Sequence, residues 1–227
     1  MKTNTLALLL ILCTCLGLAT SIPLVSPEKK IVQEGDVIYL GKIGPGQTIP
    51  FSFDPMVKTG GKFGVGGQCD RVIFLSVPEG WQDTPSKWYA DPMLTLLKSA
   101  ANAPEGKYRA AIMVIDEGGA EEIGNNISLF VEVDVVHDIM DMDVEPLKQT
   151  AGAGQPARYQ ITIRNKGAAN DVFDITATGV RDWDFRRSIF VAAGASKTVT
   201  YEIVGQEEEG YQATIVAQSA NKSVLIT

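Results

Sequence analysis

The sequence predicts an all-β protein built from two tandem immunoglobulin-like β-sandwich domains behind an N-terminal signal peptide. Two observations lead to this prediction. Apolar residues alternate with polar ones in many short segments, and Gly, Pro and Asn separate these segments at short intervals. Alternation with a period of two is the pattern of half-buried strands. Six or seven such strands with turn residues between them are typical of an immunoglobulin-like sandwich.

The C-terminal third shows this pattern most clearly. From Arg158 to Arg164, the residues Tyr159, Ile161 and Ile163 fall on one face of a strand and polar residues fall on the other. Further strands are predicted over residues 172–177, 188–192, 197–203, 211–217 and 223–227. Turn residues between these strands complete the pattern of a sandwich.

Motifs in the same region resemble a known family. They are the strand from Arg158 with its turn at Gly167, the segment Asp171-Val-Phe-Asp-Ile175, Trp183, the segment from Ala193 to Thr200, and Gly210-Tyr211. Together they are similar to the NEW3-type and CARDB-like immunoglobulin-fold modules of secreted prokaryotic surface proteins, archaeal ones included, over residues of about 140–227. The resemblance implies an immunoglobulin-like fold. It implies no catalytic residue, because such modules occur beside glycosidase and protease domains and in cell-surface proteins.

The first half of the chain has strands of its own. They are predicted over residues 37–41, 49–53, 71–77, 107–115 and 127–136. In the last of these, Val131, Val133 and Val135 alternate with acidic residues. The apolar residues from Pro92 to Ala101 fit either one helical face or a short buried strand, and we favour a strand or an irregular segment.

The domain boundaries follow from these patterns. A signal peptide is predicted for residues 1–21, since Lys2 precedes an apolar stretch over residues 6–18 and a small-residue cleavage site at Ala19-Thr-Ser21. A first sandwich is predicted for residues 22–136 and an immunoglobulin-like domain for residues 137–227. We expect a secreted or cell-surface protein whose mature chain has no transmembrane anchor. Whether the signal peptide is cleaved or lipidated at Cys15 stays open.

Charge and cysteine content exclude some function classes. The net charge of −7 argues against a nucleic-acid partner, because binding to phosphates needs clustered Lys and Arg. Removal of the signal peptide leaves Cys69 as the single cysteine, so the mature chain cannot form an internal disulfide. We expect a buried, inert thiol at Cys69, with an intermolecular disulfide as the alternative.

The sequence contains no recognisable catalytic set, and we predict that the protein is not an enzyme. Its single histidine, His137, lies at the predicted link between the domains, and no Gly-x-Ser-x-Gly motif accompanies it. A hydrolase would need His137 beside a serine or a carboxylate in a pocket.

The segment from Gly80 to Asp91 holds the predicted binding residues. Trp81, Trp88 and Tyr89 place three aromatic rings in one connection that contains proline. Exposed rings can stack on sugars or anchor a protein interface. A structural role for Trp81 in the core is the alternative.

Two further kinds of site are suggested by residue type. Asp138, Asp141 and Asp143 could provide carboxylate oxygens to a Ca²⁺ ion near the domain link, although their spacing matches no calcium loop. Asn126 and Asn221 each begin an Asn-x-Ser glycosylation acceptor. No other cofactor is expected.

These observations favour an exported, non-catalytic protein that acts through protein–protein contacts in a structural, adhesive or envelope-assembly role. The alternative is a carbohydrate-binding accessory module that takes a surface glycan, and a hydrolase is the third hypothesis. Self-association is also considered, because the extended start from Ile22 to Pro27 could pair with the sheet edge of a neighbour.

Overall fold

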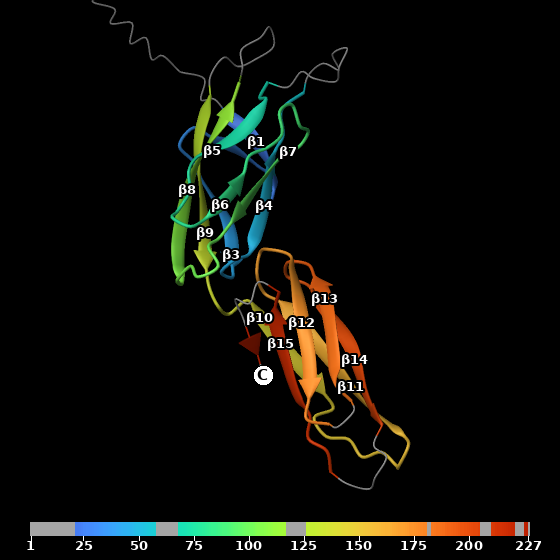
Figure 1. Ribbon diagram of the computed structural model, residues 1–227. Helices are drawn as coiled ribbons and strands as arrows, with labels where there is room; N and C mark the ends of the chain where they lie inside the picture. Colours follow the sequence, from blue (N-terminus) through green and yellow to red (C-terminus); the bar gives the residue numbers. More distant parts are fainter. Residues whose placement is uncertain are drawn as a thin grey trace, which may run out of the picture.

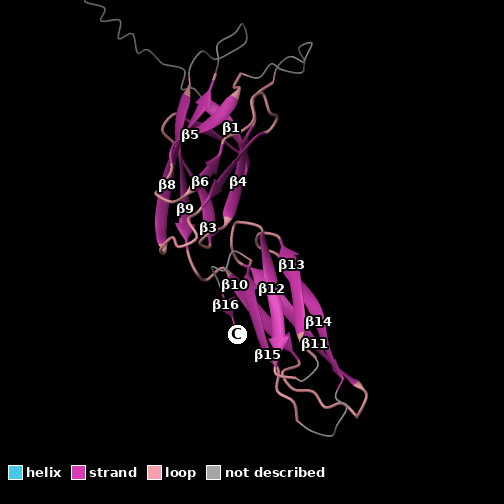
Figure 2. Ribbon diagram, viewed as in Figure 1, coloured by secondary structure: helices cyan, strands magenta, loops and turns pink. Residues whose placement is uncertain are grey.

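The computed structural model describes residues 21–57, 68–116, 126–180, 183–204, 210–220 and 225–226. These residues form strands and connections, and none of them lies in a helix. The strands build two β-sandwiches that lie end to end (Figure 1, Figure 2). The predicted all-β fold with two sandwiches is therefore confirmed. The predicted signal peptide lies outside the described residues, except that its last residue, Ser21, begins the first strand.

The first sandwich packs a five-stranded sheet on a four-stranded one. The five-stranded sheet has the order β2-β1-β4-β7-β6, with β1 at Ser21–Ser26, β2 at Lys30–Gln33, β4 at Thr48–Phe53, β6 at Gln82–Thr84 and β7 at Met93–Lys98. The four-stranded sheet has the order β3-β9-β8-β5, with β3 at Val37–Ile43, β5 at Arg71–Ser76, β8 at Gly106–Ile115 and β9 at Ile127–Val135. Strand β3 runs parallel to β9, while the other strand pairs of this sandwich are antiparallel.

The second sandwich packs a three-stranded sheet on a four-stranded one. The three-stranded sheet has the order β10-β11-β14, with β10 at Met140–Glu145, β11 at Pro156–Asn165 and β14 at Ser196–Val204. The four-stranded sheet has the order β13-β12-β15-β16, with β12 at Asp171–Thr178, β13 at Phe185–Val191, β15 at Thr214–Ser219 and β16 at Leu225–Ile226. In β11 and β14, the pairs Tyr159 with Tyr201 and Ile161 with Val199 carry the alternating residues that predicted these strands.

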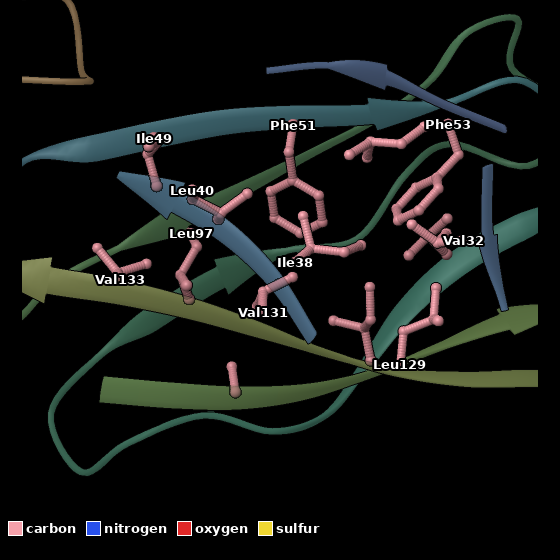
Figure 3. Close-up of a cluster of buried hydrophobic side chains, with 14 of the residues drawn as sticks. Val32, Ile38, Leu40, Ile49, Phe51, Phe53, Leu97, Leu129, Val131 and Val133 are labelled. Carbon is pink, nitrogen blue, oxygen red and sulfur yellow. The ribbon is translucent and has the colours of Figure 1, made fainter. Parts of the chain in front are cut away.

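Each sandwich has its own hydrophobic core. In the first, Phe51 and Phe53 of β4 point toward residues of β3, β7 and β9 (Figure 3). The rings of Phe51 and Phe53 meet edge to face with centroids 6.0 Å apart, and both side chains are fully buried. Burial of side chains this large is the main stabilising term of such a sandwich. The second core is centred on Phe173, Ile175 and Ile161.

Several strands differ from the sequence-based expectation. The extended start β1 does not offer a sheet edge, because it lies between β2 and β4 and pairs with both. The residues expected to form only a link and an acidic cluster instead form β10, since Met140 and Met142 face the second core while the aspartates face outward. The apolar segment after Pro92, by contrast, agrees with the sequence analysis, which favoured a strand or an irregular segment over a helix: it is the strand β7.

A buried polar contact joins the two sandwiches. Gln47, which follows β3 of the first sandwich, donates from Nε2 to Oδ2 of Asp171 at 2.6 Å. The same Asp171 oxygen accepts a 2.6 Å hydrogen bond from Ser219 Oγ in the second sandwich. All three side chains are at most 5% exposed. A buried carboxylate is tolerated only where donors such as these reach it, so the contact defines one position of the second sandwich.

The backbones of the two sandwiches also approach closely at this point. The N–H of Ala168 donates to the carbonyl oxygen of Lys42 at 2.7 Å, and Ala169 belongs to the core of the first sandwich. A Cβ atom built on Gly41 would lie 2.6 Å from the Cβ of Ala168, and the φ of Gly41 is +111°. Only glycine fits this position without displacing a neighbour. We call Gly41, Gln47, Ala168, Asp171 and Ser219 the joint.

Substitution of Gly41 tests the joint. Gly35→Ala places a side chain at a φ of +83° with nothing within 4 Å, and we expect it to lower the free energy of unfolding by about 1 to 2 kcal/mol. Gly41→Ala adds the clash with Ala168, so we expect a further loss of about 1 to 3 kcal/mol. Urea denaturation of both variants measures the difference. Equal losses would show that the close approach at Gly41 does not constrain the structure.

Candidate functional site

The predicted aromatic segment lies against the edge of β5. Between β6 and β7, the N–H of Ser86 donates to the carbonyl of Val72 at 3.0 Å, and the N–H of Val72 donates back to Ser86 Oγ at 2.8 Å. Further along, the N–H of Tyr89 donates to the carbonyl of Asp70 at 2.8 Å. These bonds hold the connection on β5, so the rings that follow Ser86 have a defined position.

Three side chains meet on the surface of this segment. The guanidinium carbon of Arg71 lies 4.9 Å from the ring centroid of Trp88, and the rings of Trp88 and Tyr89 are 5.8 Å apart. Trp88 is 41% exposed and Tyr89 is 49% exposed. A cation over an exposed ring contributes about 0.5 to 1 kcal/mol, which orders the indole. We call Arg71, Trp88 and Tyr89 the aromatic ledge.

The backbone at Tyr89 is strained. Its φ is +54°, a left-handed conformation that costs a non-glycine residue about 1 to 2 kcal/mol. The hydrogen bond from Tyr89 to Asp70 holds this conformation. Strain of this kind concentrates at functional positions, and here it coincides with a large ring that is 49% exposed.

The aromatic ledge lies at the end of the first sandwich that is remote from the joint. Strand β8 begins at Gly106 opposite Val135, which precedes the link to the second sandwich, and it ends at Ile115 opposite Arg71. Arg71 therefore lies at the outer end of β5 (Figure 1). The sequence analysis missed Arg71. The only local feature of the sequence that could have indicated Arg71 is that this arginine begins a mostly apolar strand.

Trp81, which was predicted together with Trp88 and Tyr89, is instead a core residue. It is only 7% exposed, and its ring lies 5.1 Å from that of Tyr108. Trp81 therefore has the role in the core that was the alternative to a binding role. The aromatic ledge contains only the rings of Trp88 and Tyr89.

Two of the three carboxylates proposed for calcium are partnered by a lysine. Lys166 Nζ bonds Asp138 and lies 2.8 Å from Asp141 Oδ1. These contacts, with Asp138 the larger influence, raise the pKa of Lys166 above its ordinary value. Asp143 is exposed two residues further along β10. In the part of the chain that the structure describes, no three or more His, Cys, Asp and Glu side chains are grouped so that they could hold a metal ion, and the Ca²⁺ site stays a prediction.

His137 pairs with a carboxylate on an open surface. The Nδ1 atom of His137 lies 3.0 Å from Glu105 Oε1, which also accepts a bond from the His137 backbone N–H. The backbone bond is the main reason that the pKa of Glu105 lies below its ordinary value, and the ring contact adds to it. Both side chains are more than half exposed. The pair fastens the link to the first sandwich.

A cavity of about 620 Å³ lies at the other end of the molecule, in the second sandwich. Tyr159 and Tyr211 contribute its largest side chains. Among the described residues that line it, Lys148 is the only charged one, so these residues provide no acid–base pair. The sequence analysis did not anticipate this cavity, because its walls come from the loop before β11, from β11 and β14, and from residues 210–213, which are far apart in the chain.

The two glycosylation acceptors differ in what the structure shows. Asn126 is exposed and accepts a 3.1 Å hydrogen bond at Oδ1 from the backbone of Asp116. Asn221 lies outside the described residues.

Comparison with known proteins places the chain in no family. No family model matches it, and no curated protein matches it. Among solved structures, it is similar to a β-glucosidase from Listeria innocua in complex with glucose, at 13% identity over 49% of this chain and 18% of that one, with a TM-score of 0.27. It is also similar to dimeric latent PorU from Porphyromonas gingivalis, at 13% identity over 92% of this chain and 20% of that one, with a TM-score of 0.28.

A third similar structure is the D00-D0 domain of Intimin, at 15% identity over 90% of this chain and 95% of that one, with a TM-score of 0.27. The chain spans about a fifth of the length of the β-glucosidase and of PorU. TM-scores this low carry no argument about function.

Within the described residues there is also no helix with the length and apolar character to cross a membrane.

Cys69 is enclosed by the first core. It is 1% exposed, and burial raises its pKa to about 12, with the charges of Asp116 and Asp70 adding to the effect. A thiol this buried cannot reach a second chain while the sandwich is folded. The environment therefore favours the expected inert thiol over an intermolecular disulfide.

The reactivity of Cys69 gives a direct test. At pH 8 a pKa of about 12 leaves on the order of a thousandfold less thiolate than an ordinary cysteine has. We expect alkylation of Cys69 to be slower by at least this factor in the folded protein than in urea. Peptide mass spectrometry distinguishes Cys69 from Cys13 and Cys15. Similar rates in both conditions would contradict the burial described here.

Proposed function

We propose that this is an exported, non-catalytic cell-surface or secreted protein that acts through protein–protein contacts in a structural or adhesive role. The observation that carries the proposal is the aromatic ledge, where Arg71, Trp88 and Tyr89 are gathered at the outer end of the first sandwich. Trp, Tyr and Arg are the three residue types most enriched among those that dominate the binding energy of protein interfaces.

The joint supports this proposal from the other end of the first sandwich. Its buried hydrogen bonds and close backbone contact oppose bending between the sandwiches, and a stiff pair of domains presents its outer end at a constant distance from the second sandwich. Such spacing suits a binding or adhesive protein better than an enzyme, which needs an enclosed site. His137, the one histidine, lies with Glu105 on an open surface.

A carbohydrate-binding role is the second candidate, and the exposed indole of Trp88 favours it. Sugars stack on open ring faces, and Trp88 is 41% exposed. However, the guanidinium of Arg71 covers one face of this ring at 4.9 Å. Only the opposite face is left for stacking, so we place protein contacts first.

Substitution of Trp88 tests the role of the aromatic ledge. We expect Trp88→Ala to weaken the binding of labelled protein to cells of its own species by about 30-fold or more, which corresponds to about 2 kcal/mol. Phe190→Ala is the matched control, since Phe190 is 54% exposed on the second sandwich. Fluorescence titration on cells that lack the endogenous protein measures both.

The outcomes separate the candidates. Loss of binding after protease treatment of the cells supports a protein partner, whereas loss only after periodate oxidation of surface sugars supports the glycan alternative. If Trp88→Ala binds as tightly as the unaltered protein, the aromatic ledge is not the binding surface and the proposal fails.

Export is tested separately, by mass spectrometry of the protein isolated from cell fractions. We expect an extracytoplasmic chain that begins at Ile22, after the small residues at 19–21. Recovery of the chain from the cytoplasm with residues 1–21 intact would contradict the proposed localisation.

A further inference from the structure

The outer face of the five-stranded sheet carries apolar side chains. Ile31 of β2 is 69% exposed and Leu94 of β7 is 51% exposed. Between them on the same side of the sheet, Ser52 is buried opposite Leu94, and the apolar residues are partly buried. They include Pro23, which pairs with Ile31, and Pro50, which pairs with Leu96. We call Pro23, Val25, Ile31, Pro50, Leu94 and Leu96 the outer apolar face.

The sequence of β7 is unusual for a strand with one face in water. Met93-Leu-Thr-Leu-Leu97 does not alternate, because Met93 and Leu97 enter the core while Leu94 and Leu96 point outward. Apolar residues on both faces of one strand are typical of strands that are covered on both faces.

The second sandwich provides an internal comparison. The outer face of β11 and β14 carries polar pairs, such as Arg158 with Glu202 and Thr162 with Thr198, which bond each other at 2.8 Å and 2.9 Å. This face of the second sandwich is therefore polar, whereas the outer apolar face of the first sandwich is not. The difference points to an occupant of the outer apolar face.

A groove of about 550 Å³ crosses the outer apolar face near the outer end of the sandwich. Pro23, Val25, Ile31 and Pro92 provide its apolar lining, and charged residues stand at its two sides. Lys29 and Lys30 line the side at β2, while Asp54 and Asp91 line the side toward β7. In the strand order β2-β1-β4-β7, Asp54 directly follows β4, two strand spacings or about 10 Å from β2. Asp91 lies before β7, three spacings or about 14 Å from β2. Glu28, which bonds Lys30, is not among the lining residues.

Opposite charges at the two sides of an apolar groove make the surface complementary to itself. A twofold axis through the groove would place the lysine side of one copy against the aspartate side of the other, and Ile31 of each copy against apolar residues of its partner. This is the geometry of an isologous dimer. We infer that the outer apolar face binds a second copy of this chain.

The size of the face indicates how strong the contact is. Four strands about 4.8 Å apart and six residues at about 3.4 Å each give a face of roughly 14 by 20 Å. Stable dimers bury considerably more surface, so the association is transient. This self-association goes beyond the proposed function, because it does not depend on which partner the aromatic ledge binds. If the self-association fails its test, the test of Trp88 is unaffected.

Sedimentation velocity of the purified protein from about 10 μM to about 1 mM tests self-association. We expect a concentration-dependent shift from monomer to dimer. Ile31→Asp should weaken the dimer by at least about tenfold, because it places a charge in the apolar contact. Leu147→Asp is the control, since Leu147 is 90% exposed on the second sandwich and should leave the dimer unchanged. A monomer at every concentration, or equal effects of the two substitutions, would overturn the inference.

Charge reversal tests the twofold arrangement. Lys29→Asp/Lys30→Asp makes both sides of the groove acidic and should abolish the dimer. Addition of Asp54→Lys and Asp91→Lys to this variant restores opposite signs in the reverse order, and we expect self-association to return to within about tenfold of the unaltered protein. Failure of this rescue in a folded variant would overturn the twofold pairing.

Hydrogen exchange of the unaltered protein provides a second measurement that needs no substitution. Protection of the amides of Lys30–Gln33 should rise with protein concentration, while that of Ser196–Val204 in the second sandwich should not. A rise in both segments, or in neither, would contradict a contact at this face.

Discussion

The Gln47 side chain links the two sandwiches through buried hydrogen bonds, which water molecules cannot replace because the side chain is fully buried. Its Oε1 accepts from the N–H of Gly44 at 2.8 Å, and its Nε2 donates to Asp171 at 2.6 Å. Burial makes each of these bonds necessary, since an unpaired buried carboxylate or amide costs about 1 to 3 kcal/mol. The hydrogen bond from Gln47 to Asp171 therefore favours one position of the second sandwich, and the distance from the second sandwich to the aromatic ledge follows from that position.

Asn165 prepares the second sandwich for this contact. Its Nδ2 donates to the carbonyls of Ala169 and Val191 at 2.9 Å and 3.1 Å, and its Oδ1 accepts from Gly167 at 2.9 Å. These bonds shape the turn that carries Ala168 and Ala169 into the first sandwich. Small side chains are required there because Gly41 approaches so closely. A polar turn, two alanines and one glycine thus replace the large apolar interface that stiff domain pairs otherwise need.

The two ends and two faces of the first sandwich then have different environments. One end is closed by the joint, while the other presents the aromatic ledge beside the groove with lysines on one side and aspartates on the other. Both surfaces depend on the connection from β6 to β7, which contributes Trp88 and Tyr89 to the ledge and Asp91 to the groove. Ser86, buried against β5, holds this connection in place.

The sequence by itself determined the all-β class, the two sandwiches and most of their strands, because alternation is a local property that survives in any tertiary setting. It did not separate the core ring of Trp81 from the exposed ring of Trp88, since both stand in one connection. It also could not show that Lys166 partners Asp138 and Asp141, or that Arg71 lies over Trp88. Only the tertiary structure decided these contacts. They join residues far apart in the chain, and their partners are set by strand order and by the burial of polar groups.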